Sequence, residues 1–478
     1  MSTIATKVLP PERISTDPIE RKLYSRDVAP VPEVITGAFL RTTPDAVVRP
    51  GNSEQVAALL REATRARVPV TTRAAASTGF YNTVPVRGGL VLDVNDLRGV
   101  VRIDTSRKTV RVLPATTWQE LDDALSTYGL ATMSYPSSAV SATVGGWIST
   151  QGHGIGSLRY GAVADQLVEL EVALPDGRLI HVDAESFPPM GWFPEAEGTL
   201  GVITAAELSV RPRPEAESIH LLIFEEGGEL ADAIRSLARW EPRPFTLTFA
   251  DPGYFALLSR AGFRTPLDPT QHPYLLLACF QGDPRLVGRA RNAMARLHHR
   301  ELPPEMASEE WGQRLYHLRV KRAGPSLLAA ELWMPLSGLA GYLRSVARLS
   351  RAVCLPVASY GVAVSQDWAM VMSVYPADER RKLAYLCAIG FTKRLHDLGA
   401  RNGGRPYGVG LWNTAYLPRL FDRDRLAELR SRKAALDPAG IMNPGKLYGT
   451  PLPLRAPLFG PASWALSTLF VASSRRRQ

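Results

Sequence analysis

Glycine, serine and threonine are concentrated between Tyr135 and Gly161, and this composition suits the binding of a phosphorylated ligand. Six glycines fall between Gly145 and Gly161. Glycine accepts positive φ and lets a ligand come close to the backbone. Consecutive N–H groups in such turns can point at one anion, for example a pyrophosphate. The apolar residues Val144 and Trp147 argue against a flexible linker. The stretch therefore predicts an ordered anion-binding loop, and the alternative is an ordinary glycine-rich surface loop.

Two later segments carry side chains suited to binding a carboxylate or to hydrogen-bonding with a substrate hydroxyl group. Residues 317–322 include Arg319 and Arg322, and residues 405–412 include Arg405 and Tyr407. A planar guanidinium group can bind both oxygens of a carboxylate, and a tyrosine hydroxyl can hydrogen-bond to the reacting group. We take these four as candidate catalytic residues. The alternative for each arginine is a solvated surface position.

The histidines and cysteines predict neither a metal site nor an iron–sulfur cluster. His298 and His299 are adjacent, and neighbours on a helix point in different directions. Cys279, Cys354 and Cys387 are too far apart in sequence for a CxxC ligand set. We expect free thiols in a reducing cytoplasm.

The segments around these residues predict alternating strands and helices. Val47 and Val48 form a short apolar run, and a helix capped at Asn52 or Ser53 follows it. Thr117-Trp-Gln-Glu120 is a capping box that opens another helix. Strands are expected at 70–73, 88–93, 100–103, 109–113, 166–177, 179–182, 206–210, 247–250, 274–280 and 369–374. Further helices are expected at 229–239, 284–300, 337–352 and 377–398.

Several separated motifs resemble, in order, the FAD-binding domain of the vanillyl-alcohol oxidase/p-cresol methylhydroxylase superfamily. They are Pro136-Ser-Ser138, Thr143-Val-Gly-Gly146, a Gly-x-Gly cluster, Arg159-Tyr-Gly161 and the strand-like 166–177. Within the superfamily, the chain is most similar to the glycolate oxidase D subunit and the FAD-linked D-lactate dehydrogenases. The resemblance implies an α+β fold, with a PCMH-type FAD domain of two subdomains and an inserted α+β substrate (cap) domain.

The resemblance also implies which residues contact FAD. The first loop usually reads Arg-Gly-x-Gly-Thr, whereas this chain has Arg73 followed by three alanines. Some relatives carry a histidine there that bonds covalently to the flavin, so the implied FAD is non-covalent. The implied cofactor contacts are Ala74, Ala75, Ala76, Ser77, Thr78, Pro136, Ser137, Ser138, Thr143, Gly145, Gly146, Gly152, His153, Gly156, Tyr160, Gly161, Gly201, Val202, Ile203, Asn443 and Lys446.

Composition shifts and the resemblance together suggest five parts. Residues 1–40 form an irregular, proline-rich extension, 41–214 the FAD domain and 215–404 the cap. Residues 405–450 return to complete the FAD site, and 451–478 form a tail. Residues 456–474 of the tail carry no charge and are followed by Arg475, Arg476 and Arg477. We expect this stretch either to lie in a membrane interface or to pack on its own domain or a partner.

The resemblance implies an FAD-dependent dehydrogenase or oxidase that acts on an alcohol or 2-hydroxy acid. Electrons would pass to an iron–sulfur protein, another partner protein, a quinone or oxygen. At 405–408 this chain reads Arg-Pro-Tyr-Gly, where the glycolate and D-lactate relatives have Gly-Glu-His-Gly with metal-ligand histidines nearby, so no metal is expected. The alternatives are an electron-transfer subunit of an iron–sulfur complex, a transferase resembling alkylglycerone-phosphate synthase, and a lipid-binding module that has lost FAD.

The overall composition is that of an ordinary globular protein. Of 478 residues, 45% are hydrophobic and 21% are charged, and the net charge is +10. We find no nucleic-acid recognition motif, no secretory leader and no apolar run long enough to span a bilayer. The positive charge fits an anionic lipid, an acidic partner or a carboxylate substrate. We expect a cytoplasmic protein, with possible peripheral contact at the inner face of the membrane.

Overall fold

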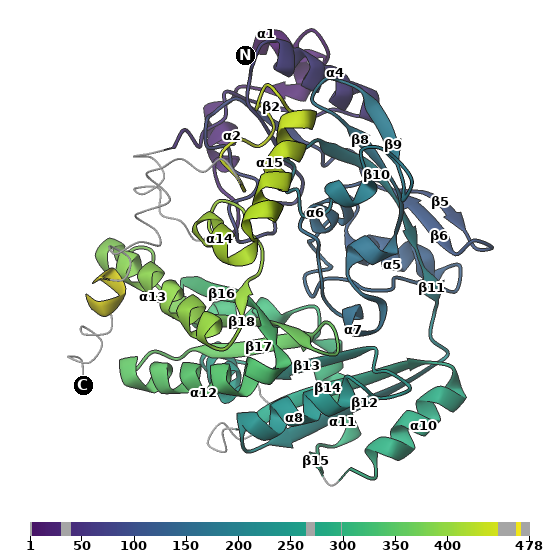
Figure 1. Cartoon of the computed structure of the whole chain (residues 1–478), viewed down its shortest axis with the longest axis vertical. Helices are drawn as coiled ribbons and strands as arrows, with labels where there is room; N and C mark the ends of the chain where they lie inside the picture. Colours follow the sequence, from purple (N-terminus) through teal and green to yellow (C-terminus); the bar gives the residue numbers. More distant parts are fainter. Residues whose placement is uncertain (1, 30–39, 264–272, 298, 448–464, 470–478) are drawn as a thin grey trace. The chain divides into compact units, whose positions relative to one another are not determined.

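The chain divides into two compact units, which we describe separately. A computed structural model describes residues 2–29, 40–263, 273–297, 299–447 and 465–469. The first unit comprises residues 1–152, 162–212 and 408–455, and the second comprises 153–161, 213–407 and 456–478. Both units combine helices with β-sheets, which confirms the predicted α+β class (Figure 1).

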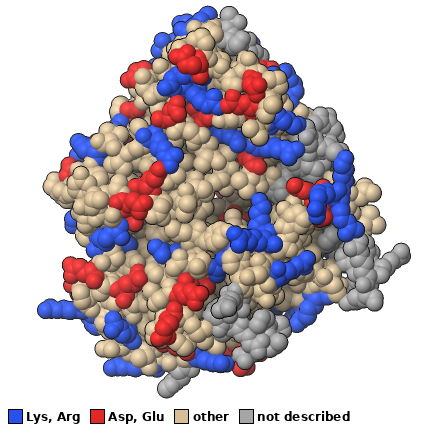
Figure 2. Space-filling view, turned by 180° about the vertical axis from the view of Figure 1, so that it is seen from behind, with Lys and Arg blue, Asp and Glu red and all other residues tan. Residues whose placement is uncertain are grey.

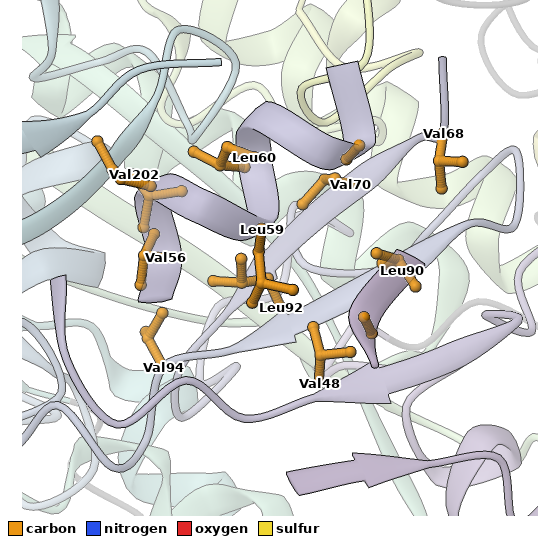
Figure 3. Packing of buried hydrophobic residues seen from close by; sticks show 14 of the residues in the cluster. Val48, Val56, Leu59, Leu60, Val68, Val70, Leu90, Leu92, Val94 and Val202 are labelled. Carbon is orange, nitrogen blue, oxygen red and sulfur yellow. The ribbon is translucent and has the colours of Figure 1, made fainter. Parts of the chain in front are cut away.

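The first unit begins with a four-stranded sheet in the order β1-β2-β4-β3. β2 (Ala46–Val48), β4 (Leu90–Asp93) and β3 (Val70–Arg73) run parallel, and β1 (Ile14–Ser15) is an antiparallel edge. Strands of a parallel sheet are usually buried on both faces, so their sequences are nearly continuous apolar runs. α4 (Ser53–Arg65), capped by Asn52 as predicted, packs Val56, Leu59 and Leu60 against Val48, Val70 and Leu92 (Figure 3).

A five-stranded antiparallel sheet completes most of this unit, in the order β5-β6-β10-β8-β9. Its strands are β5 (Val100–Asp104), β6 (Thr109–Val112), β8 (Leu167–Ala173), β9 (Leu179–Val182) and β10 (Val202–Ser209). α5 (Trp118–Ser126) begins with the predicted capping box of Thr117 and Glu120. β7 (Leu130–Ala131) pairs with β11 (Arg211–Pro212), and α15 (Arg423–Leu436) lies in the return segment.

The second unit is built on an eight-stranded sheet in the order β15-β12-β14-β13-β17-β18-β16-β19. The strands are β12 (Ala216–Phe224), β13 (Thr246–Ala250), β14 (Tyr274–Gly282), β15 (Arg300–Glu301), β16 (Ser326–Pro335), β17 (Ala358–Ala363), β18 (Trp368–Ala377) and β19 (Arg405–Pro406). The helices, several of which are labelled along the sheet in Figure 1, are α7 (Ser157–Tyr160), α8 (Gly227–Leu237), α9 (Pro252–Arg260), α10 (Pro284–Met294), α11 (Pro304–Gly312), α12 (Leu336–Val353) and α13 (Lys382–Arg401), with the 3-10 helix η5 (His317–Ala323).

One face of this sheet is sealed by α12 and α13. The hydroxyl of Tyr342 on α12 hydrogen-bonds to Ser373 of β18 at 2.7 Å. The hydroxyl of Tyr375 donates to the carbonyl of Ala388 on α13 at 2.6 Å. Along β16, every second residue from Ser326 to Met334 is buried and the residues between are only partly buried. The opposite face of β16 is therefore the more accessible one.

Three features of the sequence prediction need correction or qualification. The N-terminal extension is not irregular where it is described, because it forms α1 (Ser2–Ala5), β1 and α2 (Pro18–Leu23), and β1 joins the first sheet. The helix predicted at 284–300 ends at Met294 and is followed by β15. The predicted membrane-interfacial tail lies outside the described residues except for 465–469, a helical turn held to Arg394 of α13 through Ser467 and Thr468.

Basic and acidic side chains are interspersed over the face shown in Figure 2 rather than separated by sign. Among the described residues, none of the helices has the length and apolar character needed to span a membrane.

Candidate functional site

The first predicted cofactor loop follows β3 and borders a cavity. Ala76 adopts a φ of 52°, which is unusual for a residue with a Cβ atom. The cavity has a volume of about 500 Å³ and is lined by Lys22, Leu23, Arg26, Asp27, Val28, Arg73, Ala75 and Ala76. The Arg73 guanidinium donates to the carbonyl of Arg26 at 2.5 Å and lies over the ring of Tyr24. The lining thus carries three cationic side chains around a loop expected to hold a pyrophosphate.

The glycines of the central stretch serve close packing in the first unit. Gly145 and Gly146 lie inside α6 (Val144–Ser149). A Cβ atom on Gly145 would lie 2.6 Å from Pro114 Cβ, and one on Gly152 would lie 2.1 Å from Trp147 Nε1. The amide groups of Gly145 and Gly152 donate to the carbonyls of Pro114 and Trp147. Glycine is therefore required at these two positions because a side chain would collide with its neighbours. The N–H groups of both glycines are already hydrogen-bonded to carbonyl groups of the protein.

Positive φ, which the sequence analysis expected of these glycines, occurs later in the stretch. Gly156 has a φ of 89° and Gly161 a φ of 77°. With His153 and Tyr160, they belong to the second unit. The ring of His153 meets Trp333 of β16 edge-on at 4.6 Å, and Tyr160 contacts Phe245 at 6.4 Å. Nothing tests the cofactor role predicted for these four residues, so it stays a prediction.

A turn at Glu197 joins α6 to the return segment. The amide of Glu197 donates to the carbonyl of Ser149 at 3.0 Å. Its carboxylate accepts the amides of Val409 and Gly410, at 3.1 Å and at 2.8–3.0 Å. Its carbonyl accepts the side-chain amide of Asn443 at 2.7 Å. Three segments far apart in the sequence are thus fixed to one another through one residue.

The predicted polar residues of the return segment lie beside this turn. Asn443 Nδ2 also donates to the carbonyl of Asn82 at 3.0 Å. Lys446 Nζ donates to the carbonyl of Val84 at 2.5 Å and to Asn443 Oδ1 at 3.3 Å. We call the loop 72–84, residues 143–152, the turn 195–203 and residues 443–446 the cofactor cradle. The cradle brings together the predicted residues Asn443 and Lys446 with the segments that hold Ala74–Thr78, Thr143–Gly152 and Gly201–Ile203.

Burial shifts the ionisation of the charged groups in and around the cradle. It raises the pKa of Glu197 to about 7 and that of Asp27 to about 6, and it lowers the pKa of Lys446 to about 8. The positive charge of Lys446 partly offsets the rise for both acids. This charge balance lets buried carboxyl groups and a buried amine share one site.

The residues of the cradle fit a large polar cofactor such as FAD. The hydroxyls of Thr72 and Thr83 are buried without a hydrogen-bond partner in the described parts of the chain. Buried hydroxyls are normally paired with protein groups or with water, so these two are an unusual feature of the cradle. Gly198 has a φ of 70°, and a Cβ atom there would fill the space between Thr72 and Asn443. Gly201 is also required, because a Cβ atom would lie 2.8 Å from the carbonyl of Ala173.

The accessible face of the second unit's sheet carries two rows of side chains. Residues opposite each other on paired strands lie on the same face. One row crosses Tyr360, Met372 and Glu331, and the next crosses Val362, Met370 and Trp333. Tyr407 lies beside Glu331, because its backbone amide donates to the Glu331 carbonyl at 2.9 Å. The rings of Tyr407 and Trp333 are in contact, with their centroids 5.7 Å apart. We call Glu331, Trp333, Tyr360, Met370, Met372 and Tyr407 the aromatic patch.

The aromatic patch contains one acidic group and rigid neighbours. Burial raises the pKa of Glu331 to about 8. Tyr360 lies between the ring of His317, stacked at 5.6 Å, and that of Tyr254 at 5.1 Å. Burial also lowers the pKa of His317 to about 4, aided by the nearby Arg319. His317 is therefore neutral above about pH 5, and Tyr360 is held in place by aromatic contacts from η5 and α9.

The four residues predicted to be catalytic do not share one environment. Arg319 is buried and paired with Glu310 at 3.3 Å. Arg322 is exposed, with its guanidinium over the ring of Phe263 at 5.3 Å. Arg405 is exposed, lies opposite Trp333 on the neighbouring strand and has its guanidinium over Trp368 at 5.5 Å. By strand register Arg405 lies in the row of Trp333, and Tyr407 joins the aromatic patch through its contacts with Glu331 and Trp333.

Sequence reasoning missed Glu197, Glu331 and Tyr360. Glu331 and Tyr360 lie on β16 and β17, two strands that were not predicted. A signal for Glu331 was present, because it is a lone acid in an apolar alternating run from Ser326 to Pro335. Glu197 precedes a Gly-Thr-Leu-Gly turn, and its burial was not readable from the sequence.

Comparison with known proteins identifies the class to which the chain belongs. A family model described as the FAD binding domain matches residues 44–183. A second, described as the C-terminal domain of FAD linked oxidases, matches residues 213–447. The chain belongs to the FAD-linked oxidases, as the motifs predicted, and its cofactor is FAD.

Named relatives and solved structures agree with this class. Glycolate oxidase subunit GlcD of Bacillus subtilis is 24% identical over 458 residues, covering 92% of this chain and 94% of that protein. D-lactate dehydrogenase of Archaeoglobus fulgidus is 25% identical over 413 residues, covering 84% and 90%. A structure of p-cresol methylhydroxylase with substrate bound has a TM-score of 0.81 at 17% identity, covering 94% of this chain and 96% of that one. An alkyldihydroxyacetonephosphate synthase structure, at 18% identity, has a TM-score of 0.73 and covers 93% and 86%.

Proposed function

We propose that this protein oxidises a CH–OH group of a small molecule and passes the electrons to a separate acceptor. The observation that carries the proposal is the cofactor cradle, in which segments far apart in the sequence meet around a buried, charge-balanced polar network of Glu197, Asn443 and Lys446. The likeness to glycolate oxidase subunit GlcD and to D-lactate dehydrogenase supports the CH–OH class.

The chain's residues would hold the cofactor without a covalent bond. Residues 74–76, where the family sometimes carries a linking histidine, are alanines. Bound FAD supplies the hydride acceptor for the reaction. Arg73 and the loop 74–78 would hold the pyrophosphate, and Asn443 and Lys446 would fix the return segment around it. We infer that the cofactor lies on 41–214 plus the return segment 405–450 and the substrate on the cap 215–404. The family models for an FAD binding domain at 44–183 and for the C-terminal domain of FAD linked oxidases at 213–447 support a division near residue 213.

The second unit would supply the groups that bind the substrate and remove its hydroxyl proton. Tyr407 is the residue of our four original candidates that belongs to the aromatic patch. Arg405, opposite Trp333, is the remaining candidate for a substrate carboxylate. Arg319 is committed to Glu310, so we assign it a structural role in the cap. The electron acceptor would be an iron–sulfur protein, another partner protein, a quinone or oxygen.

The test is the absorbance of the purified protein before and after acid precipitation. We expect flavin bands near 375 and 450 nm (approximate values for free flavin) that move to the supernatant, as for a non-covalent cofactor. Anaerobic mixing with a panel of alcohols and 2-hydroxy acids should then bleach the longer-wavelength band. A flavin that no member of the panel bleaches would exclude CH–OH oxidation and favour an electron-transfer or transferase role.

A further inference from the structure

The segment 284–300 of the second unit is basic along its whole length. It contains five arginines and no acidic residue. α10 forms the first part of this segment and packs against β12 and β14 near one edge of the sheet (Figure 1). The helix buries Val287, Ala290 and Met294. Its opposite side is therefore left to the polar and charged residues of the segment.

Three of the arginines form one row on this outer side of α10. Successive residues of an α-helix are about 100° apart, so Arg285, Arg289 and Arg296 point away from the buried residues. Arg285 and Arg289 are one turn apart. Arg296 follows on the same side just past the end of the helix, where its amide donates to the carbonyl of Ala293 at 3.2 Å. All three arginines are exposed, and we call them the arginine stripe.

The arginine stripe has no acidic partner within the ranges that the structure describes. The acids at the two ends of the segment are bound to other groups. The carboxylate of Asp283 accepts the amides of Arg285 and Leu286, at 2.8 and 3.4 Å. The carboxylate of Glu301 is hydrogen-bonded to His220 Nδ1 at 2.7 Å. The stripe is therefore a row of positive charge without a counter-charge beside it.

This arrangement is unfavourable for the helix that carries it. Arginines on two other helices are paired, because Arg425 binds Glu428 on α15 and Arg235 binds Asp232 on α8. In the stripe, two like charges lie four residues apart, which destabilises a helix. Arg285 is also in the first turn, where the helix dipole disfavours a cation. Local rules of this kind are typically broken at functional surfaces.

We propose that the arginine stripe is the docking surface for an acidic protein partner. Arginine is enriched at protein interfaces whereas lysine is depleted there, and a planar guanidinium group binds both oxygens of a carboxylate. Carboxylates one turn apart on a helix of the partner would match the spacing of Arg285 and Arg289.

The composition of the segment disfavours two other anionic partners. A helix that binds a membrane surface buries an apolar face in the lipid. None of the large hydrophobic residues that are exposed in the described parts of the chain lies in 284–300. Binding of single-stranded nucleic acid usually adds stacking on aromatic side chains, and the segment contains no Phe, Tyr or Trp. An acidic protein surface requires neither feature.

Replacement of the whole stripe by glutamine tests the proposal in the full-length protein. The probe is fluorescently labelled poly-L-glutamate, and its binding is measured by anisotropy at low ionic strength, where charges are least screened. The variant that combines Arg285→Gln, Arg289→Gln and Arg296→Gln should bind the probe at least about tenfold more weakly. Its midpoint of thermal unfolding should stay the same or rise, because like charges are removed. A fall in the midpoint would mean that the arginines stabilise the fold and would overturn the proposal.

A second triple variant removes the same number of charges from another helix of the unit. Arg344, Arg348 and Arg351 are exposed on α12, which has no acidic residue of its own. They differ from the stripe in lying beside the acidic start of α8, since a Cβ atom on Gly228 would lie 3.9 Å from Arg344 Nη1. The variant that combines Arg344→Gln, Arg348→Gln and Arg351→Gln should bind the probe within about twofold of the wild type.

The remaining outcomes decide whether the stripe is a specific surface and what it binds. Equal weakening in the two triple variants would show a general effect of net charge and overturn the docking surface, as would a wild type that does not bind poly-L-glutamate. Vesicles that contain phosphatidylserine provide the last comparison. Loss of vesicle binding in the α10 variant without loss of poly-L-glutamate binding would identify a membrane as the partner and overturn the proposal. These measurements are independent of the proposed oxidation.

Discussion

The carboxylate of Glu197 accepts the backbone N–H of Gly410 at both of its oxygens, although 213 residues separate the two in sequence. Gly410 has a φ of 53°, and a Cβ atom there would lie 2.0 Å from the carbonyl of Phe80. Phe80 in turn accepts the amides of Leu411 and Trp412 at that carbonyl. The first cofactor loop, the Glu197 turn and the return segment are therefore mutually dependent.

Replacement of Glu197 by alanine should destabilise the first unit. The amides of Val409 and Gly410 would lose their acceptor while remaining buried, at a cost of about 2–3 kcal/mol. Chemical denaturation monitored by circular dichroism would measure the loss, and retention of flavin through gel filtration should fall with it. The exposed Glu185→Ala serves as control. An unchanged free energy of unfolding in Glu197→Ala would contradict the assigned interaction.

Alanine at Gly152 should disturb the packing of α6. The added Cβ atom would overlap the Trp147 ring, and overpacking of this kind typically costs about 1–3 kcal/mol. Gly191→Ala is the comparison, because no heavy atom lies within 4 Å of a Cβ atom there and its φ is not positive. The midpoints of thermal unfolding should differ between the two variants. Similar midpoints would show that the close approach of Gly152 to Trp147 does not affect the stability of the fold.

Glycine should be better tolerated at Ala76 than at its neighbour Ala75. A left-handed backbone costs a residue with a Cβ atom about 1–2 kcal/mol, and Ala76 adopts that conformation whereas Ala75 is outside it. Ala76→Gly should therefore equal or exceed the wild type in stability. Ala75→Gly should lose about 0.4–1 kcal/mol through the greater entropy of the unfolded chain. The reverse order in urea unfolding would contradict the backbone geometry of this loop.

Local signals in the sequence were sufficient for much of the first unit. The cap at Asn52 and the capping box at Thr117 are formed within a few residues of chain, so their helices could be predicted. Strands β12, β16 and β17 were not predicted. Their stability comes from pairing with strands that are distant in sequence, which a local pattern does not report.

Site residues could be predicted where they belong to a sequence motif. They could not be predicted where the pairing of distant strands brings them together. Asn443 and Lys446 were predicted as cofactor contacts from the family resemblance of the return segment, and the structure buries both beside Asn82 and Val84. The alignment of Glu331, Met372 and Tyr360 in one row follows only from the register of three antiparallel strands. The reason given for Gly145 and Gly152 was also incomplete, because the constraint is the ring of Pro114 or Trp147 rather than the torsion angle.

The return segment also sets the order in which the molecule can be built during translation. Met442 pairs with Val70 at the edge of the first sheet, and the amide of Asn443 donates to the Val70 carbonyl at 2.7 Å. A ribosome must therefore synthesise more than 360 further residues before Val70 gains this neighbour and Lys446 reaches Val84. Contacts of such sequence separation form slowly. The nascent chain will expose an incomplete cradle throughout that interval, so flavin capture is a late event and chaperone dependence is expected.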